Sequence, residues 1–138
     1  MLNTFDLVLF GGTGDLSTRK LIPALFRQET VSSLDDDSNI IGVGTRDLSQ
    51  EDYLNVVKAS LDTHFPSFSN HQDSWDKFKK RITYYKLDIT SEEDWNNFKQ
   101  TDNDRVTVFY LAIPPSLYKD ISQKLNDNNF ITPNSRIV

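Results

Sequence analysis

Three glycines within four residues, Gly11, Gly12 and Gly14, constrain this chain more than any other feature. They follow an apolar run typical of a strand (residues 5–10) and precede a run with helical periodicity (residues 21–26). Glycine tolerates a positive φ and has no Cβ, so the backbone here can turn sharply and come close to a ligand. The first amides of the following helix are unpaired and lie at the positive end of its dipole. Strand, glycine turn and helix in this order therefore predict a phosphate-binding unit.

Two frames describe this turn. Gly12-x-Gly14-x-x-Ser17 is a dinucleotide fingerprint with a small residue at its third position, where the helix packs closely on the strand. Gly11-x-x-Gly14 covers the same residues, and the sequence leaves the choice open. The competing interpretation is a tight turn that binds nothing, but a plain turn rarely needs three glycines.

Strand-like and helix-like segments alternate along the whole chain. We expect strands at residues 5–10, 39–44, 82–87 and 106–111, and the start of a fifth at 137–138. Helices are expected at about residues 15–30, after a Ser49 cap, around 75–78, after a Ser91 cap, and around 117–125. Right-handed connections then give one domain over residues 1–138, with a Rossmann-like, doubly wound parallel sheet in a three-layer αβα fold of the α/β class.

The first helix carries one exception to its pattern. Its apolar stripe, expected to face the sheet, consists of Leu16, Leu21, Leu25 and Phe26. Pro23 lies beyond the first turn, where its missing N–H should bend or tighten the helix.

Composition excludes several classes of partner and site. The 138 residues carry a net charge of −5, which argues against nucleic acid and anionic membranes as partners. Without cysteine there is neither a disulfide nor a thiolate metal site, and the aspartates at 35–37 lack the alternate spacing of a calcium loop. No apolar run is long enough to span a bilayer, and no signal sequence precedes the first strand. We expect a soluble cytoplasmic protein without a metal.

Ligands in open α/β sheets gather at the carboxyl ends of the strands. At the end of the second strand, an acid would bind the ribose of NAD, whereas an arginine would pair with the 2′-phosphate of NADP. Arg46 therefore favours NADP, unless it faces water or pairs with Asp47. Asp88 and Ile89 follow the third strand, where Asp88 either contacts the adenine end of the cofactor or caps a turn. Ala112 after the fourth strand would let the backbone pass close to a flat ligand.

No catalytic residue can be assigned. His64 and His71 lie away from every expected strand end and are interpreted as surface residues. No Ser/His/Asp set and no paired carboxylates converge on the expected site, so a general base is missing.

Four stretches of the chain fit one known family. The string GGTGDLSTRKLIPALF at residues 11–26 is similar to the coenzyme motif of the glucose-6-phosphate dehydrogenase family, in which a GxxGDLA-like signature leads into a basic, proline-containing helix. IGVG at 41–44 and YLAIPPxxY at 110–118 also match, and SRIV at 135–138 resembles the run before the family's EKPxG motif. The resemblance spans the whole chain.

The resemblance implies an amino-terminal coenzyme domain. The family oxidises glucose 6-phosphate to 6-phosphogluconolactone with NADP as hydride acceptor, the first step of the pentose phosphate pathway. The residues implied in cofactor binding are Gly11, Gly12, Thr13, Gly14, Asp15, Leu16, Ser17, Thr18, Lys20, Ala112 and Tyr118. The match departs after the second strand, where the family's arginine position holds Thr45 and Arg46 comes one residue later. Either residue is therefore a candidate for the 2′-phosphate.

Because the chain ends just inside an apparent strand, we expect it to be a fragment. The EKP motif, histidine base and sugar-phosphate pocket that the resemblance implies would lie beyond Val138, in a parent protein expected to be a homo-oligomer. We therefore expect cofactor binding without catalysis. The alternatives are an NADP-sensing regulator without catalytic function and a sugar-nucleotide epimerase. An epimerase needs a Tyr-x-x-x-Lys pair, and neither Tyr118-Lys119 nor the run at 84–86 has that spacing.

Overall fold

One parallel sheet forms the centre of the molecule. The computed structural model describes residues 4–32, 34–98 and 105–138. Its strands are β1 (Phe5–Phe10), β2 (Asn39–Gly44), β3 (Ile82–Lys86), β4 (Val106–Leu111) and β5 (Ser135–Ile137). All neighbouring strands pair in parallel, in the order β3-β2-β1-β4-β5. The expected parallel sheet is confirmed, and its fifth strand begins two residues earlier than predicted.

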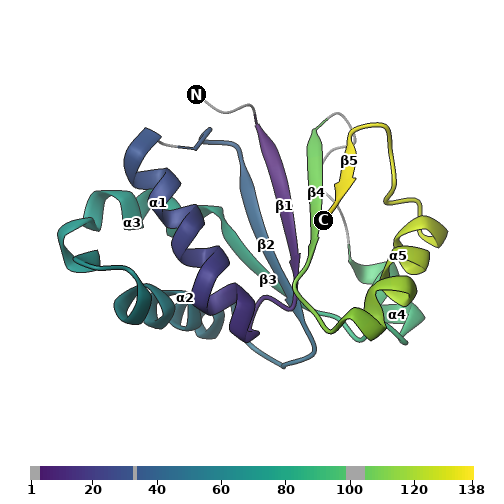
Figure 1. Ribbon diagram of the computed structural model, residues 1–138. Coiled ribbons are helices and arrows are strands. Elements are labelled where there is room, and N and C mark those ends of the chain that lie inside the picture. The colour runs from purple at the N-terminus through teal and green to yellow at the C-terminus, as the bar shows by residue number, and fades with distance from the viewer. Residues whose placement is uncertain (1–3, 33, 99–104) are drawn as a thin grey trace.

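Helices cover the two faces of this sheet, as Figure 1 shows. One face carries α1 (Ile22–Ser32), α2 (Gln50–His64) and α3 (Gln72–Arg81), with a short turn, η2 (Phe68–Asn70), before α3. The other carries α4 (Glu92–Asn97) and α5 (Tyr118–Asp127), the latter preceded by η3 (Pro115–Leu117). This arrangement confirms the doubly wound, Rossmann-like αβα fold.

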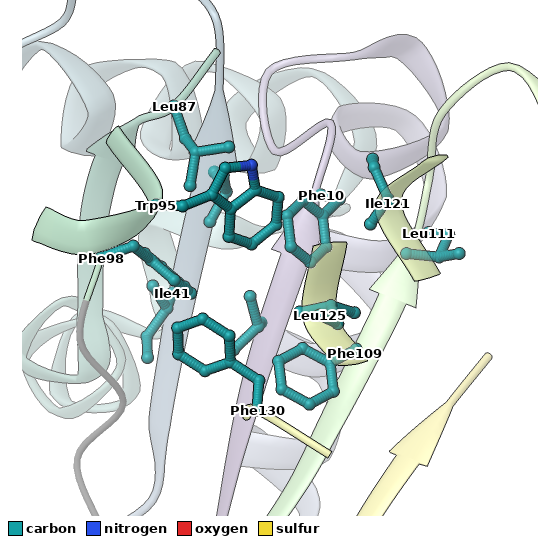
Figure 2. Packing of buried hydrophobic residues seen from close by; sticks show 12 residues of the cluster. Phe10, Ile41, Leu87, Trp95, Phe98, Phe109, Leu111, Ile121, Leu125 and Phe130 are labelled. Atoms are coloured by element: carbon teal, nitrogen blue, oxygen red, sulfur yellow. The ribbon is translucent and has the colours of Figure 1, made fainter. Parts of the chain in front are cut away.

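Each face of the sheet has its own buried core. On the α4–α5 side, aromatic rings from the sheet and the helices pack together, and Figure 2 shows Trp95 beside Phe10 with Phe98 and Phe130 around them. The ring centroids of Phe10 and Trp95 are 6.2 Å apart. On the other side, Phe26 of α1 makes edge-on contacts with Phe65, Phe68 and Phe78. Two packed cores hold the strand ends in fixed positions.

Serine caps begin two of the helices, as predicted. The Ser49 hydroxyl accepts the amide of Asp52 at 3.0 Å, and the Asp52 carboxylate accepts the amide of Ser49, which completes a capping box. Ser91 likewise accepts the amide of Asp94 at 3.1 Å. Three acidic residues in the first turn of α4 add a favourable interaction with its dipole.

The first helix differs from the prediction at Pro23. Helical backbone begins at Asp15, but residues Ser17–Leu21 form a π-helical turn (η1), so the helix is widened there rather than tightened. The amide of Ile22 accordingly reaches back to the carbonyl of Ser17. The extra residue of a π turn shifts the face presented by the residues before it. Leu16 is therefore exposed, and its predicted place in the sheet-facing stripe is wrong.

A buried ion pair joins α1 to the end of α3. Arg81, which directly precedes β3, is the last residue of α3. Its Nε lies 2.7 Å from Oε1 of Glu29, and both side chains are almost fully buried. Its other nitrogens donate to the carbonyls of Leu34, Asp35 and Ser38. Arg81 thus fixes the loop that leads into β2.

Over the described ranges, no helix combines the length and apolar character needed to cross a membrane.

Candidate functional site

The connections of the sheet change direction between β1 and β4. From β1 the chain passes through α1 to β2 on one side, whereas β4 lies on the other side of β1 and continues into α5 on the opposite face (Figure 1). Ligands of open α/β sheets bind at such a switch point, beyond the carboxyl ends of the strands. The glycine turn after β1 and Ala112 after β4 meet there, because the amide of Ala112 donates to the carbonyl of Phe10 at 2.9 Å.

The turn itself requires glycine at its first position. Gly11 has a φ of 83°, and a Cβ on it would clash with the carbonyl of Ala112. The amide of Gly14 closes the turn on the carbonyl of Gly11 at 2.9 Å. The glycine with the positive φ, Gly11, is thus the first residue of the Gly11-x-x-Gly14 frame. The sequence alone did not choose between this frame and the Gly12-x-Gly14-x-x-Ser17 frame.

Ser17 occupies the small-residue position of the other frame. Its side chain is fully buried, and its hydroxyl donates to the carbonyl of Gly11 at 2.8 Å. Thr18 similarly donates its hydroxyl to the carbonyl of Gly14 at 3.1 Å. Both hydroxyls brace the turn from the helix side. The first helical amides, which have no acceptor within a helix, begin at Asp15 directly beyond the turn.

The charged residues of this segment lie on the surface. Asp15 forms an exposed ion pair with Arg19, with 2.8 Å between Oδ2 and Nη2. Lys20 is exposed on the π turn, and Thr13 is half-buried within the glycine turn. Lys20 thus adds an exposed positive charge to the first turns of this helix.

Thr45 and Arg46 lie together just beyond β2. Both are exposed, and their backbone belongs neither to β2 nor to α2. The carbonyl of Arg46 accepts the hydroxyl of Tyr84 at 2.8 Å. The guanidinium charge also lies near enough to that phenol to oppose the rise that burial causes in the pKa of Tyr84. Thr45 and Arg46 therefore both lie at the strand end where dinucleotide folds bind the 2′-hydroxyl or 2′-phosphate group.

Asp88 caps the turn that follows β3, at residues 89–90. Its carboxylate accepts both the hydroxyl and the amide of Thr90, at 2.7 and 2.9 Å. These bonds, the hydroxyl bond foremost, lower the pKa of Asp88. Its neighbour Ile89 packs against the α4–α5 core and accepts the indole N–H of Trp95 at 2.9 Å. The capping role does not test a contact of either residue with adenine, which stays a prediction.

Tyr118 begins α5 on the far side of the switch point. It is exposed and follows the proline-started turn η3, as expected for proline at a helix start. Ala112, whose amide bonds to the carbonyl of Phe10 before the glycine turn, precedes Tyr118 by six residues. A contact of Tyr118 with the cofactor stays a prediction.

Tyr53 and Tyr84 also belong to this site, although neither was predicted as a site residue from the sequence. Their rings stack with centroids 4.7 Å apart, and the Tyr53 hydroxyl donates to the carbonyl of Gly12 at 3.0 Å. A signal was present in β2, where Gly42 and Gly44 alternate on one face of the strand. A Cβ at Gly42 would clash with Tyr53, so these glycines make room for the two rings.

The two histidines lie in the helical layer. His64 is exposed at the end of α2, as expected. His71 is half-buried, with its ring 5.7 Å from that of Phe65, and so is less exposed than predicted. Neither residue adjoins the glycine turn in sequence or in any contact described above.

Sequence comparison assigns this arrangement to a known family. The family described as glucose-6-phosphate dehydrogenase, NAD binding domain, matches residues 8–138, almost the whole chain. The chain belongs to the glucose-6-phosphate dehydrogenase family. The switch point and the glycine turn thus lie within the region that matches the family's NAD binding domain.

Individual relatives support the same family assignment. The chain is 38% identical over 137 residues to glucose-6-phosphate 1-dehydrogenase from Rhizobium meliloti, and 37% identical over 139 residues to that from Gluconobacter oxydans. Each alignment covers 97% of this chain but 28% of the relative. The chain therefore spans little more than a quarter of these relatives.

Solved structures show the same fold. The crystal structure of glucose-6-phosphate 1-dehydrogenase from Mycobacterium avium matches with a TM-score of 0.87 at 26% identity, covering 97% of this chain and 29% of that one. A glucose-6-phosphate dehydrogenase in complex with its substrate glucose 6-phosphate matches with a TM-score of 0.81 at 27% identity, covering 99% of this chain and 30% of the other.

Proposed function

We propose that this chain binds NADP as the coenzyme domain of a glucose-6-phosphate dehydrogenase. The observation that carries the proposal is the Gly11 turn at the switch point, closed against Ala112, in a chain that the family covers over residues 8–138. In the whole protein, the domain would present NADP to glucose 6-phosphate, and hydride transfer would yield 6-phosphogluconolactone.

Each part of the site has a proposed role. The backbone from Gly11 to Thr18 holds the cofactor phosphates at the helix start, with Lys20 supplying positive charge nearby. Arg46 pairs with the 2′-phosphate at the end of β2. Ala112 and Tyr118 line the path of the cofactor past β4, and Asp88 and Ile89 face its adenine end.

Arg46→Ala tests the proposed preference for NADP. A guanidinium meets a phosphate through charge-assisted hydrogen bonds, and the exposure of Arg46 places its contribution at the lower end of their range. We expect NADP to bind about tenfold more weakly, a loss of about 1.4 kcal/mol, while NAD binding changes little because NAD lacks that phosphate. Calorimetric titration of both cofactors measures this.

The matched control is Arg27→Ala, an exposed arginine in the middle of α1 that lies outside the proposed site. It should leave both affinities unchanged. Equal losses for NADP and NAD in Arg46→Ala would refute the assignment of Arg46, and Thr45→Ala would then test the family's usual arginine position.

A further inference from the structure

The stacked tyrosines connect the two parts of the proposed site. Tyr53 comes from α2 and Tyr84 from β3, and their rings lie nearly parallel, at 29°. Tyr53 donates to the carbonyl of Gly12 in the phosphate turn, and Tyr84 donates to the carbonyl of Arg46 beyond β2. One aromatic pair thus supports both the segment shared by all dinucleotides and the segment that would select NADP.

The Arg46 segment depends on such support. Residues 45–49 lie between β2 and α2, outside strand and helix pairing, and Arg46 is exposed. The Tyr84 hydroxyl reaches this segment because Gly44 has no side chain. A Cβ on Gly44 would lie only 2.9 Å from Tyr84 Oη, tighter than ordinary van der Waals contact. Glycine at this position of β2 therefore keeps a path open between the phenol and the backbone it holds.

Tyr84 is itself well anchored. Its ring is half-buried against the fully buried Tyr53, and it lies within β3, which pairs with β2 through Gly42 opposite Tyr84. A fixed phenol that donates to a carbonyl in an exposed loop reduces the number of conformations the loop can adopt. The side chain that benefits is Arg46, whose guanidinium must meet a phosphate in a defined geometry.

We propose that Tyr84 is a positioning residue for recognition of the 2′-phosphate, acting through its hydrogen bond to the Arg46 carbonyl. The proposal rests on the proposed NADP function, in which Arg46 reads that phosphate. Tyr84 is not assigned a contact with the cofactor. Its effect is on where Arg46 points, so it should alter the ratio of NADP to NAD affinity rather than both affinities.

Tyr84→Phe removes the hydroxyl and keeps the stacked ring. We expect NADP to bind about three- to tenfold more weakly, the usual effect of one lost hydrogen bond, with NAD affinity unchanged within about twofold. Tyr85→Phe is the matched control, since Tyr85 is the exposed neighbour on β3 whose ring contacts Phe98 on the opposite side. It should change neither affinity.

Tyr53→Phe gives a contrasting signature. It removes the bond to Gly12 in the phosphate turn that NADP and NAD share, so both cofactors should bind more weakly by a similar factor. A loss of NADP and NAD affinity alike in Tyr84→Phe as well would show a general structural role and overturn the proposal.

A double variant separates this inference from the proposed function. In an Arg46→Ala background, Tyr84→Phe should cause no further loss of NADP affinity, because the residue it positions is gone. A persisting loss would mean that the phenol acts independently of Arg46, which overturns the inference. If Arg46→Ala alone weakens NADP but Tyr84→Phe does not, the inference fails and the proposed function stands. If Arg46→Ala leaves NADP affinity intact, the assignment of Arg46 fails first, and the inference with it.

Discussion

At the scale of single residues, polar groups buried away from the site hold the loops that shape it. Arg81 donates to Glu29 and to three carbonyls of the segment before β2, and Glu29 also accepts the amide of Leu34 at 2.8 Å. A buried charge with a full set of partners is stable, but removing one partner leaves the other uncompensated. Arg81 is therefore one of the side chains that hold the segment before β2 in place.

Arg81→Ala should lower the free energy of unfolding by about 3–5 kcal/mol, because it leaves Glu29 buried without its cation. Urea unfolding followed by circular dichroism measures the change. Lys80→Ala, an exposed neighbour on α3, should stay within about 0.5 kcal/mol of the parent. Arg81→Lys keeps the charge but not the forked geometry, so it should fall between the two. A loss in Arg81→Ala no larger than in Lys80→Ala would contradict this role.

Alkaline pH should test the burial of Tyr53. Burial raises the pKa of this phenol above its ordinary value near 10, and Tyr84 beside it adds to the rise. Above about pH 10 the unfolded chain loses this proton while the folded chain keeps it, so stability is lost as pH rises. The slope from this group should approach about 1.4 kcal/mol per pH unit until the folded protein also titrates.

The measurement is the free energy of unfolding between neutral and alkaline pH, for the parent and for Tyr53→Phe. The variant lacks the titrating hydroxyl, so its curve should fall less steeply. Identical slopes would show that Tyr53 ionises as readily folded as unfolded.

At the scale of elements, the first helix shows how one proline is accommodated. In the π turn, the amide of Ile22 bonds to Ser17, so the carbonyl of Thr18 would next need an amide from residue 23. Pro23 has none. The hydroxyl of Ser60, from α2, donates to the Thr18 carbonyl instead. The widened turn is thus completed by a neighbouring helix.

Ser60→Ala should leave this carbonyl without its partner and lower the free energy of unfolding by about 1–2 kcal/mol. Ser60 is buried, so water cannot freely replace the hydroxyl. Ser69→Ala, an exposed serine in η2, is the matched control and should have little effect. Thermal and urea unfolding of both variants measure the difference. Equal stabilities of the two variants would show that the Ser60 hydroxyl does not stabilise the π turn.

The elements also show what could be read from the sequence. The strands and the serine caps were predictable because their signals are local, namely apolar runs and a hydroxyl three residues before an acid. The π turn was not, since the partner that stabilises it, Ser60, is 42 residues away from Thr18. For the same reason the sequence located the glycine turn but missed Tyr53, which lies 41 residues from the Gly12 carbonyl it binds.

At the scale of the whole molecule, part of the sheet on the α1 side borders an open groove. On the α1 side, an apolar groove of about 310 Å³ lies between α1 and the sheet. Its lining comes from α1 and η1 with β1 and β4, and includes Leu9, Leu25 and Val108.

The relatives are more than three times longer than the region they share with this chain. The chain therefore corresponds to a small part of the length of such a protein.

The 138-residue chain should bind NADP yet show no turnover of glucose 6-phosphate. Oxidising a sugar hydroxyl by hydride transfer requires a base to take the hydroxyl proton. Among the described residues, His64 ends α2, a helix of 15 residues that begins beside the β2 end of the site. Its length places His64 about 20 Å from that end, and the ring of His71 packs against that of Phe65, the residue after His64. Adding glucose 6-phosphate and NADP to pure chain should produce no reduced nicotinamide above the enzyme-free background, while calorimetry on the same sample shows NADP binding. Reduction of NADP that depends on glucose 6-phosphate would mean that this chain itself supplies the base. Binding of NADP without its reduction would show that this chain binds the coenzyme but does not catalyse the oxidation.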